Sequence, residues 1–293
     1  MSFDESRLDK LIKRRFGKSI PQSLIEKAIR DRDILIDGRK VKASDKISDD
    51  AEIFVHPKIQ KIFLNCSCEK QCEKQIDYKN YIDQFKGMII HEDNELIIIN
   101  KPSGLPVQLG SKLSLAVDVM AKAYNPEARL VHRIDKDTSG ITILTKNLVT
   151  TRAMLYLFQN KEIEKNYAAI VTGKLPDKKF VIDAPLSKRH EKVVIDYEYG
   201  KKSITKFKIL DSTNDTTLIL VTPITGRTHQ IRVHLASINC PIVGDTKYGN
   251  RKYDFLCLHA KHISFKKMDG KKISITAELP QHFFINDINQ IKK

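Results

Sequence analysis

The stretch Leu130-Val-His-Arg-Ile-Asp-Lys-Asp-Thr-Ser-Gly140 lies between two short apolar runs. The first run covers residues 129–131, and the second, from Ile141 to Leu144, is typical of a β-strand. Thr-Ser-Gly between them is a turn signal. We therefore expect Asp135 in a tight loop held by strands on both sides, a position in which catalytic side chains are often found.

The pattern of elements extends outward from this loop in both directions. Apolar runs predict strands over 88–93 and 95–100 on its N-terminal side, and over 164–171 and 217–222 on its C-terminal side. Asn147 is placed to cap a helix that runs to Gln159, with Leu148, Met154, Leu155 and Phe158 as a core-facing side. Thr228 is placed to cap a second helix that runs to about Ser237.

The chain divides by composition into three parts. Residues 1–58 combine apolar residues at helical spacing with short strand-like runs and form a small N-terminal domain. Residues 59–86 are polar and Lys-rich and predict a linker, and residues 87–293 form the larger domain. The linker carries Cys66, Cys68 and Cys72, but a fourth metal ligand is missing, so we expect surface thiols and no metal.

Charge and hydropathy narrow the class of protein. The 293 residues carry a net charge of +15, which favours a polyanionic partner such as nucleic acid. No apolar run is long enough for a membrane span, and the N-terminus lacks the apolar segment of a secretion signal. Five Cys without such a signal indicate reduced thiols, so a cytoplasmic location is expected.

The opening stretch resembles the active-site loop of the RluA family of pseudouridine synthases, His-Arg-Leu-Asp-x-x-Thr-Ser-Gly. Only Ile134 departs from that pattern, as one aliphatic residue in place of another. Three further segments are similar to the family's motifs: Lys101-Pro-Ser-Gly-Leu105, Lys165-Asn-Tyr-Ala-Ala169 and Gly226-Arg-Thr-His-Gln-Ile-Arg-Val-His234. The resemblance implies an α+β fold with a mixed, mainly antiparallel sheet flanked by helices.

The resemblance also implies roles for individual residues. Asp135 is the expected catalytic carboxylate, Arg232 its partner in a bidentate ion pair, and Tyr167 the residue that stacks on uracil and takes the C5 proton. The isomerisation exchanges an N–C for a C–C glycosidic bond and needs no metal, nucleotide or redox cofactor. Whether Asp135 attacks C1′, attacks the base or removes the 2′ proton stays open.

Other residues of these motifs are expected to contact RNA. Arg133 is suited to fill the space of an extruded uridine, with a simple phosphate contact as the alternative. His132, Arg227 and Lys101 complete the RNA-binding set, although we favour structural support for Lys101. For His229 and His234 we expect hydrogen-bonded structural roles.

The N-terminal domain resembles the S4-type (alpha-L) RNA-binding domain in its Arg7-Leu-Asp-Lys, Ala28-Ile-Arg and Ile36-Asp-Gly-Arg-Lys-Val motifs. Its charge alone does not decide the matter, because 14 Lys and Arg stand against 11 Asp and Glu in residues 1–58. By position, the resemblance implies phosphate contacts for six basic residues: Arg7, Lys10, Arg14, Arg30, Arg39 and Lys40.

Alternative functions fit the sequence less well. Asp135-x-Asp137-x-Ser139-Gly140 starts like a calcium loop, but Lys146 stands where the bidentate Glu is required. A retaining glycosidase needs a second placed carboxylate, which is missing. The resemblance favours the branch of the family called C, which acts on 23S rRNA, and we expect a monomer. The same chemistry on tRNA and a non-catalytic RNA-binding assembly factor are the remaining alternatives.

Overall fold

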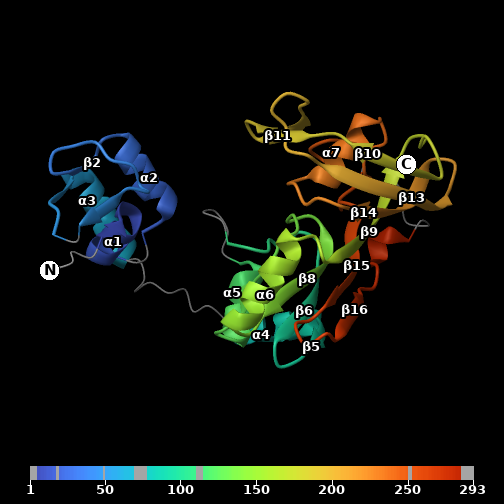
Figure 1. Cartoon of the computed structure of the whole chain (residues 1–293), viewed down its shortest axis with the longest axis horizontal. Helices are drawn as coiled ribbons and strands as arrows, with labels where there is room; N and C mark the ends of the chain where they lie inside the picture. Colours follow the sequence, from blue (N-terminus) through green and yellow to red (C-terminus); the bar gives the residue numbers. More distant parts are fainter. Residues whose placement is uncertain are drawn as a thin grey trace. The chain divides into compact units, whose positions relative to one another are not determined.

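The structure is a computed structural model that describes residues 5–17, 20–48, 50–68, 78–109, 115–249 and 253–284. It separates into an N-terminal unit, residues 1–77, and a C-terminal unit, residues 78–293 (Figure 1). Each unit has its own apolar core. The two units are therefore described separately.

The N-terminal unit packs three helices against two pairs of short strands. Leu8, Ile12, Ile25 and Phe63 are fully buried and form the centre of its core. Its elements are β1 (Glu5–Arg7), α1 (Leu8–Phe16), α2 (Gln22–Arg30), β2 (Ile34–Ile36), β3 (Lys46–Ser48), β4 (Ile53–Val55) and α3 (Pro57–Cys68). β1 pairs with β3 and β2 pairs with β4, in both cases antiparallel.

Helices occupy much of the segment that we expected to be a linker. α3 extends to Cys68, and its Ile59 and Phe63 are buried in the N-terminal core. α4 (Tyr78–Met88) belongs to the C-terminal unit, where Phe85 is fully buried. Both helices lie in a segment that is polar and Lys-rich overall, so its composition hid the apolar residues at helical spacing. Cys72 lies outside the described residues.

The C-terminal unit is built on a 10-stranded sheet in the order β10-β13-β14-β9-β15-β8-β6-β5, with β16 beside β15 and β7 beside β8. Every pair is antiparallel except β15 with β8, so the predicted mixed, mainly antiparallel sheet is confirmed. The strands are β5 (Ile89–Glu92), β6 (Leu96–Lys101), β7 (Arg129–Leu130), β8 (Ser139–Thr145), β9 (Glu164–Thr172), β10 (Lys179–Asp183), β13 (Ile204–Ser212), β14 (Thr216–Pro223), β15 (Leu258–Lys266) and β16 (Lys272–Thr276).

Helices and a hairpin complete this unit. They are α4, α5 (Val117–Tyr124), α6 (Leu148–Gln159), α7 (Gln230–Ser237), the 3-10 helix η2 (Gln281–Phe283) and the hairpin of β11 (Leu186–Arg189) with β12 (Lys192–Ile195). In Figure 1, α4, α5 and α6 lie beside the β5-β6-β8 half of the sheet, and α7 lies beside the β9-β14-β13 half.

β6 shows why this sequence forms a central strand. Leu96 and Ile98 enter one core with β8 and α6, and Ile97 and Ile99 enter another with α4 and α5. Successive side chains of a strand point to opposite faces, so a strand covered on both faces must be apolar without alternation. All four are fully buried, and burial stabilises each by about 1.5–3 kcal/mol.

β15 lies in the middle of the sheet, between β9 and β8. Its parallel contact with β8 places Ala260 opposite Gly140. Gly140 has a φ of 107°, and a Cβ there would lie 2.4 Å from the carbonyl oxygen of Ala260. The glycine that ends the Asp135 loop therefore lets the two strands approach each other.

Two predicted helices exist, with differences at their ends and faces. Asn147 caps α6 as expected, since its Oδ1 accepts the Thr150 backbone N–H at 2.8 Å. Met154 is buried in the core, but Leu148 and Leu155 are exposed, so our core-facing side was too wide. The cap at Thr228 was wrong, because α7 begins at Gln230 with His229 in the capping position.

No helix in the described parts of the chain combines the length and the apolar character that a membrane crossing requires.

Candidate active site

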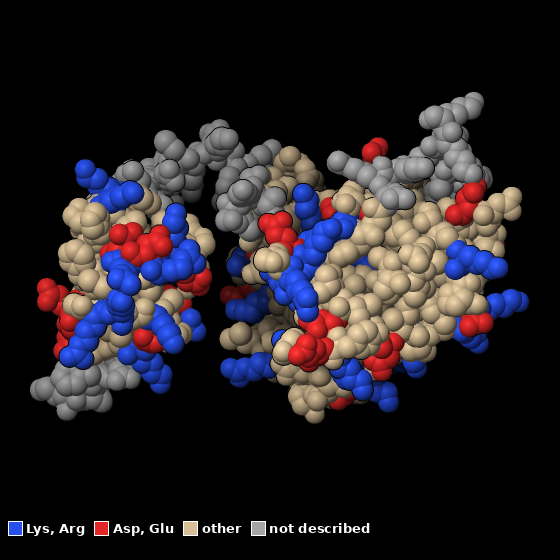
Figure 2. Space-filling view, turned by 90° about the horizontal axis from the view of Figure 1, so that it is seen from above, with Lys and Arg blue, Asp and Glu red and all other residues tan. Residues whose placement is uncertain are grey.

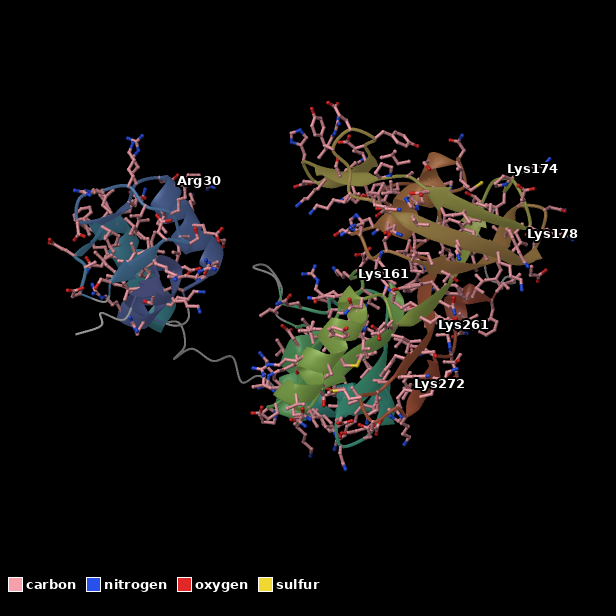
Figure 3. All side chains as sticks on the ribbon, in the orientation of Figure 1. Arg30, Lys161, Lys174, Lys178, Lys261 and Lys272 are labelled. Atoms are coloured by element: carbon pink, nitrogen blue, oxygen red, sulfur yellow. The ribbon has the colours of Figure 1, made fainter. Side chains whose placement is uncertain are left out.

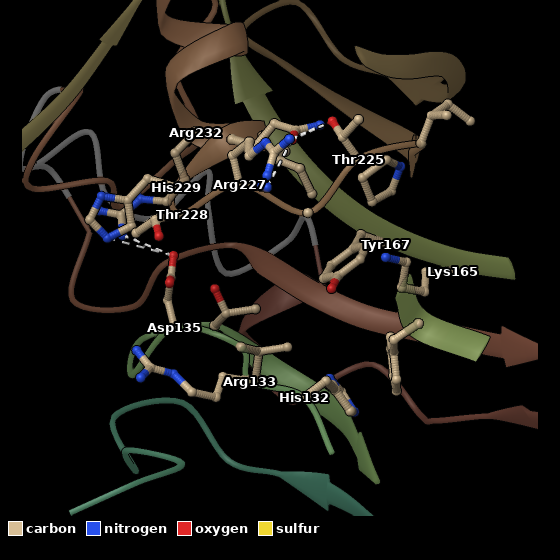
Figure 4. Close-up of a pocket in the computed structure, with 18 of the residues that line it drawn as sticks. His132, Arg133, Asp135, Lys165, Tyr167, Thr225, Arg227, Thr228, His229 and Arg232 are labelled. Carbon is tan, nitrogen blue, oxygen red and sulfur yellow. Dashed lines mark hydrogen bonds and ion pairs between the residues drawn. The ribbon is translucent and has the colours of Figure 1, made fainter. Parts of the chain in front are cut away.

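A pocket of about 980 Å³ opens in the C-terminal unit (Figure 4). One side is formed by residues 130–138, here called the Asp135 wall, and the facing side by residues 223–232, called the Arg232 wall. Phe158, Lys165 and Tyr167 lie between them. The pocket therefore gathers Asp135, Tyr167, Arg232, His132, Arg133 and Arg227, all of which the sequence motifs single out.

The Asp135 wall follows from two strand pairings. β7 pairs with the end of β8, so the chain between Leu130 and Ser139 closes as a short loop. Within it, the Thr138 backbone N–H donates to the Asp135 carbonyl oxygen at 3.2 Å. The carboxylate of Asp135 projects into the pocket (Figure 4), with 29% of its side chain exposed. This placement agrees with the predicted loop between strands.

Lys101 supports this wall from beneath and does not reach RNA. Its side chain is fully buried at the end of β6. Its ammonium donates to three backbone carbonyl oxygens at 2.7–2.9 Å, those of Pro102, Leu105 and Lys136. Burial lowers the pKa of Lys101 to about 7, while the charges of Asp137 and Asp135 oppose that change. These contacts and the burial agree with the structural support that we favoured for Lys101 over a contact with RNA.

His132 lines the pocket as a neutral ring. Its Nε2 accepts the Ile143 backbone N–H at 2.9 Å, so the ring proton is on Nδ1. The ring stacks on Phe158 with centroids 4.8 Å apart. Burial lowers the pKa of His132 to about 3, and the charge of Lys165 acts in the same direction. His132 can thus present a flat surface to a base but cannot act as a cation for phosphate.

The guanidinium of Arg232 binds a residue that sequence reasoning missed. Its Nε and Nη2 each donate to Asp245 at 2.8 Å, and this pair is buried. Although burial opposes it, the hydrogen bonds from Arg232 hold the pKa of Asp245 below its usual range. The remaining nitrogen, Nη1, lies 3.6 Å from Asp135 Oδ2. Arg232 does face Asp135 as expected, but its bidentate partner is Asp245.

Gln230 fixes the turn that precedes α7. Its Oε1 accepts the Thr225 hydroxyl at 2.7 Å and the Arg227 backbone N–H at 3.0 Å. Its Nε2 donates to the Ile204 carbonyl and to the Thr205 hydroxyl. A buried amide thus satisfies the polar groups of this turn, the task that we had assigned to Thr228.

His229 lies closer to Asp135 than its expected structural role suggested. Its backbone is left-handed, with a φ of 54°, and its Nε2 is 3.8 Å from Asp135 Oδ2. Its Nδ1 is 2.7 Å from the Tyr248 hydroxyl oxygen. Burial lowers the pKa of His229 although the charge of Asp135 opposes this, and the charges of Arg232 and Lys247 add to the decrease. A neutral imidazole therefore faces the carboxylate.

Tyr167 is held in the middle of the sheet by β9, which pairs with β14 on one side and with β15 on the other. Burial raises the pKa of Tyr167, and the negative charge of Asp135 adds to this effect. The hydroxyl is therefore protonated at neutral pH. The ring is available for stacking, but the free protein does not hold the phenolate that the expected proton abstraction from C5 would need.

Arg133 and Arg227 are exposed at opposite sides of the same pocket (Figure 4). The Nε of Arg227 donates to the Lys202 carbonyl at 3.3 Å. Arg133 lies two residues before Asp135, at the mouth of the pocket. Both guanidiniums can thus reach a polyanion that enters it.

The basic candidates of the N-terminal unit divide into two groups. Arg7 donates to Asp9 through Nε and Nη2, so part of the donor capacity of Arg7 is used within the unit. Asp9 also accepts a hydrogen bond from Gln22. The other five are exposed: Arg14, whose Nη2 lies 3.4 Å from the Ser6 hydroxyl, and Lys10, Arg30, Arg39 and Lys40. Figure 2 shows basic side chains mixed with acidic ones on the face of this unit that is in view.

The parts of the chain that the structure describes show no metal site, and two of their thiols are buried. No group of three or more His, Cys, Asp or Glu there is arranged to hold a metal ion. Cys240 and Cys257 are free and buried, and burial raises the pKa of Cys257 to about 12. These two thiols are therefore part of the core.

Comparisons with known proteins agree on one family. The sequence profile described as RNA pseudouridylate synthase matches residues 95–237. The ribosomal large subunit pseudouridine synthase C of Rickettsia bellii is 36% identical, over 95% of this chain and 96% of that protein. The protein of the same name from Buchnera aphidicola is also 36% identical, over 96% and 92%. Among solved structures, human RNA pseudouridylate synthase domain containing 4 aligns with a TM-score of 0.61 and 27% identity, covering 73% of this chain and 98% of that one.

Proposed function

This chain belongs to the RNA pseudouridylate synthase family, and we propose that it isomerises specific uridines of 23S rRNA to pseudouridine with Asp135 as its catalytic carboxylate. The observation that carries the proposal is the position of this carboxylate. It projects into the pocket with Arg232 and His229 both facing its Oδ2. The names of the similar bacterial proteins support a substrate in the large ribosomal subunit.

The pocket supplies what the reaction requires. Uracil must leave C1′, turn and rejoin through C5, which needs a carboxylate and a site that holds the detached base. Arg232 Nη1 faces Oδ2 of Asp135 across 3.6 Å, and Asp245 holds the guanidinium in place. The rings of Tyr167 and His132 are placed to hold the base between the two walls. No cofactor takes part in this proposal.

Arg133 and Arg227 are proposed to bind the RNA around the flipped nucleotide. A uridine in a folded RNA has to leave its stack before it can enter a pocket. The planar guanidinium of Arg133, beside Asp135 and exposed, is suited to the vacated place. Arg227 on the facing wall is suited to a phosphate contact. A monomer that acts in the cytoplasm fits this function.

The direct test is a map of pseudouridine in total RNA from cells with and without the gene, read as reverse-transcription stops after carbodiimide treatment. We expect stops in 23S rRNA to be lost, to return with the wild-type gene and to stay absent with Asp135→Asn. The variant should bind RNA within about tenfold of wild type, because phosphate contacts remain.

Other outcomes of the map would change the proposal. Stops lost only from tRNA would keep the chemistry and change the substrate. An unchanged map would favour a non-catalytic RNA-binding factor. Restoration of the stops by Asp135→Asn would remove Asp135 from its role.

We further propose that the N-terminal unit is an S4-like module that binds the RNA backbone. Replacement of four of its exposed candidates by Gln (Lys10, Arg30, Arg39 and Lys40) should weaken rRNA binding. The slope of log affinity against log salt should fall by about 0.7–0.9 for each phosphate that the variant no longer binds. The measurement is binding of an rRNA fragment at several salt concentrations.

A second variant with the same change in charge serves as the control. Lys174, Lys178, Lys261 and Lys272 lie in the C-terminal unit away from the pocket (Figure 3), and none of them lines it. Their replacement by Gln should leave the slope nearly unchanged. Equal slopes for the two quadruple variants would show that the N-terminal residues respond only to overall charge.

A further inference from the structure

The Tyr248 hydroxyl joins the β11–β12 hairpin to the candidate active site. Its oxygen accepts the Val193 backbone N–H of β12 at 3.0 Å. The same oxygen lies 2.7 Å from Nδ1 of His229. The other ring nitrogen of His229, Nε2, points at Asp135 Oδ2 across 3.8 Å. A continuous polar path therefore runs from the backbone of the hairpin to the carboxylate.

The contacts of this hydroxyl bear on which nitrogen of His229 carries the proton. The Val193 N–H occupies one acceptor position of the Tyr248 oxygen, and the phenolic hydrogen needs an acceptor of its own. In the described part of the chain, Nδ1 of His229 is the acceptor within its reach. Nδ1 is then unprotonated, and a neutral ring carries its proton on Nε2, the nitrogen that faces Asp135.

The Tyr248 ring also positions His229 and Arg232 by direct contact. It meets the His229 ring edge-on, with centroids 5.4 Å apart. Its face also lies under the guanidinium of Arg232, 5.3 Å from ring centroid to Cζ. Asp245 fixes the start of the Tyr248 segment by accepting the Tyr248 backbone N–H at 3.0 Å. One tyrosine thus touches both residues that face the carboxylate.

Both of these residues approach the same oxygen of Asp135. Arg232 Nη1 and His229 Nε2 lie 3.6 and 3.8 Å from Oδ2. Among the described residues, no hydrogen bond or ion pair reaches Oδ1. These distances exceed those of hydrogen bonds, and contacts of this kind often tighten when substrate binds. The arrangement holds one oxygen and leaves the other open to the pocket.

We propose that Tyr248 is a positioning residue that keeps His229 as the neutral Nε2–H tautomer, so that His229 and Arg232 together hold Oδ2 and leave Oδ1 to react. A neutral donor orients the carboxylate without adding a second cation to Arg232. Four charged groups surround the ring, namely Asp135, Asp245, Arg232 and Lys247. The effect on catalysis rests on the proposed function, whereas the tautomer of His229 does not.

The test is the tautomer of His229 in the full chain, labelled with ¹⁵N-histidine and read from long-range ¹H–¹⁵N NMR correlations. The His229 signals are assigned by their loss in His229→Gln. We expect an unprotonated Nδ1 and a protonated Nε2 in wild type. Tyr248→Phe keeps the ring and removes the hydroxyl, so protonation of Nδ1 should increase.

The same variant is assayed on the RNA whose modification depends on the gene. kcat should fall about fivefold to tenfold, the size expected for one neutral hydrogen bond, while KM stays within about twofold. Tyr124→Phe is the matched control, because it loses a hydroxyl bonded to Glu92 at 2.9 Å, away from the pocket. It should change neither the tautomer nor kcat.

Two results would overturn the inference. The first is a wild-type His229 with its proton on Nδ1. This result comes from the wild-type protein alone and does not depend on whether a variant folds. The second is a tautomer that Tyr248→Phe leaves unchanged. Absence of pseudouridine formation by the wild-type protein would instead count against the proposed function, and the tautomer would still be read.

Discussion

The Asp135 wall is held at its backbone carbonyl oxygens, whereas the Arg232 wall is held at its own side chains. On the first, the Lys101 ammonium and the Gly104 N–H both donate to the Lys136 carbonyl. On the second, Asp245 holds the guanidinium of Arg232, and the Gln230 amide holds the turn before α7. The two sides of one pocket thus depend on different parts of the sequence.

This contrast determines where each wall is vulnerable. A loop held at its backbone carbonyls tolerates most changes of its own side chains, but it fails where the supporting Lys101 is lost or the path of the chain is blocked. A side-chain-held wall loses its geometry when a single partner is replaced. Substitutions should therefore separate the two walls by their effects on folding and on activity.

The largest effect is expected at Gly140, where the Asp135 wall joins β8. In Gly140→Ala the new Cβ meets the Ala260 backbone, and the free energy of unfolding should fall by more than about 4 kcal/mol. Chemical denaturation of the variant measures this loss. Gly270→Ala is the control, because its φ of 82° is also positive but no atom lies within 4 Å of the added Cβ.

Gly270→Ala should cost only the backbone strain, about 1–2 kcal/mol. The difference between the two variants then measures the close approach of β8 and β15. Similar losses in both would contradict the idea that this contact fixes the Asp135 wall.

A smaller effect on stability is expected at Asp245, together with a loss of activity. Asp245→Asn leaves the buried guanidinium of Arg232 without its counter-charge, which should cost about 3 kcal/mol. Because Arg232 is also released from its orientation, the rate of pseudouridine formation at saturating RNA should fall at least about tenfold. Denaturation and single-turnover kinetics measure the two effects.

Asp196→Asn is the matched control for the Arg232 wall. Asp196 is also buried, but its partner Arg189 is 62% exposed on the β11–β12 hairpin, where an ion pair contributes at most about 1 kcal/mol. The saturating rate should stay close to that of wild type. A loss of rate equal to that of Asp245→Asn would show that neither effect depends on Arg232.

The last effect is a dependence of stability on pH. Burial lowers the pKa of His132 to about 3 and that of His259 to about 4, both below the usual value of 6.5. Below pH 6.5 the unfolded chain takes up protons that the folded chain refuses, so stability is lost as pH falls. Each histidine contributes up to about 1.4 kcal/mol per pH unit.

Urea denaturation between about pH 7 and pH 5 measures this slope. His132→Gln keeps an acceptor for the Ile143 N–H and removes one titrating group, so its slope should be shallower. An unchanged slope would mean that His132 does not titrate as its burial requires. A shallower slope would assign part of the acid sensitivity to the Asp135 wall.

The sequence could predict the parts that depend on local pattern. The strands on either side of Asp135 and the strand of Tyr167 follow from runs of apolar residues, and the structure has them at the expected places. The Asn147 cap is a local signal of the same kind. Motif resemblance added Arg232, which does lie beside Asp135.

Partners that meet only in the folded chain could not be predicted in this way. Asp245 follows α7 in a separate loop, and no spacing rule places its carboxylate against Arg232. Lysine is seldom buried, and the carbonyl oxygens that surround Lys101 converge from two different loops. Phe63 and Phe85 are fully buried, but they belong to a segment that is polar and Lys-rich overall, so composition alone did not indicate their burial.

The central position of β15 has a consequence for how the protein is made. His259 of β15 is hydrogen-bonded to Ser139 of β8, a residue 120 positions earlier. The edge of β8 that faces β15, where the Asp135 wall ends, therefore has no neighbouring strand until late in synthesis. Contacts of such long range form slowly, because a large loop must close first. We therefore expect a nascent chain to gain activity only after β15 and β16 have left the ribosome. Truncation before Leu258 would remove a strand from the middle of the sheet and not from its edge.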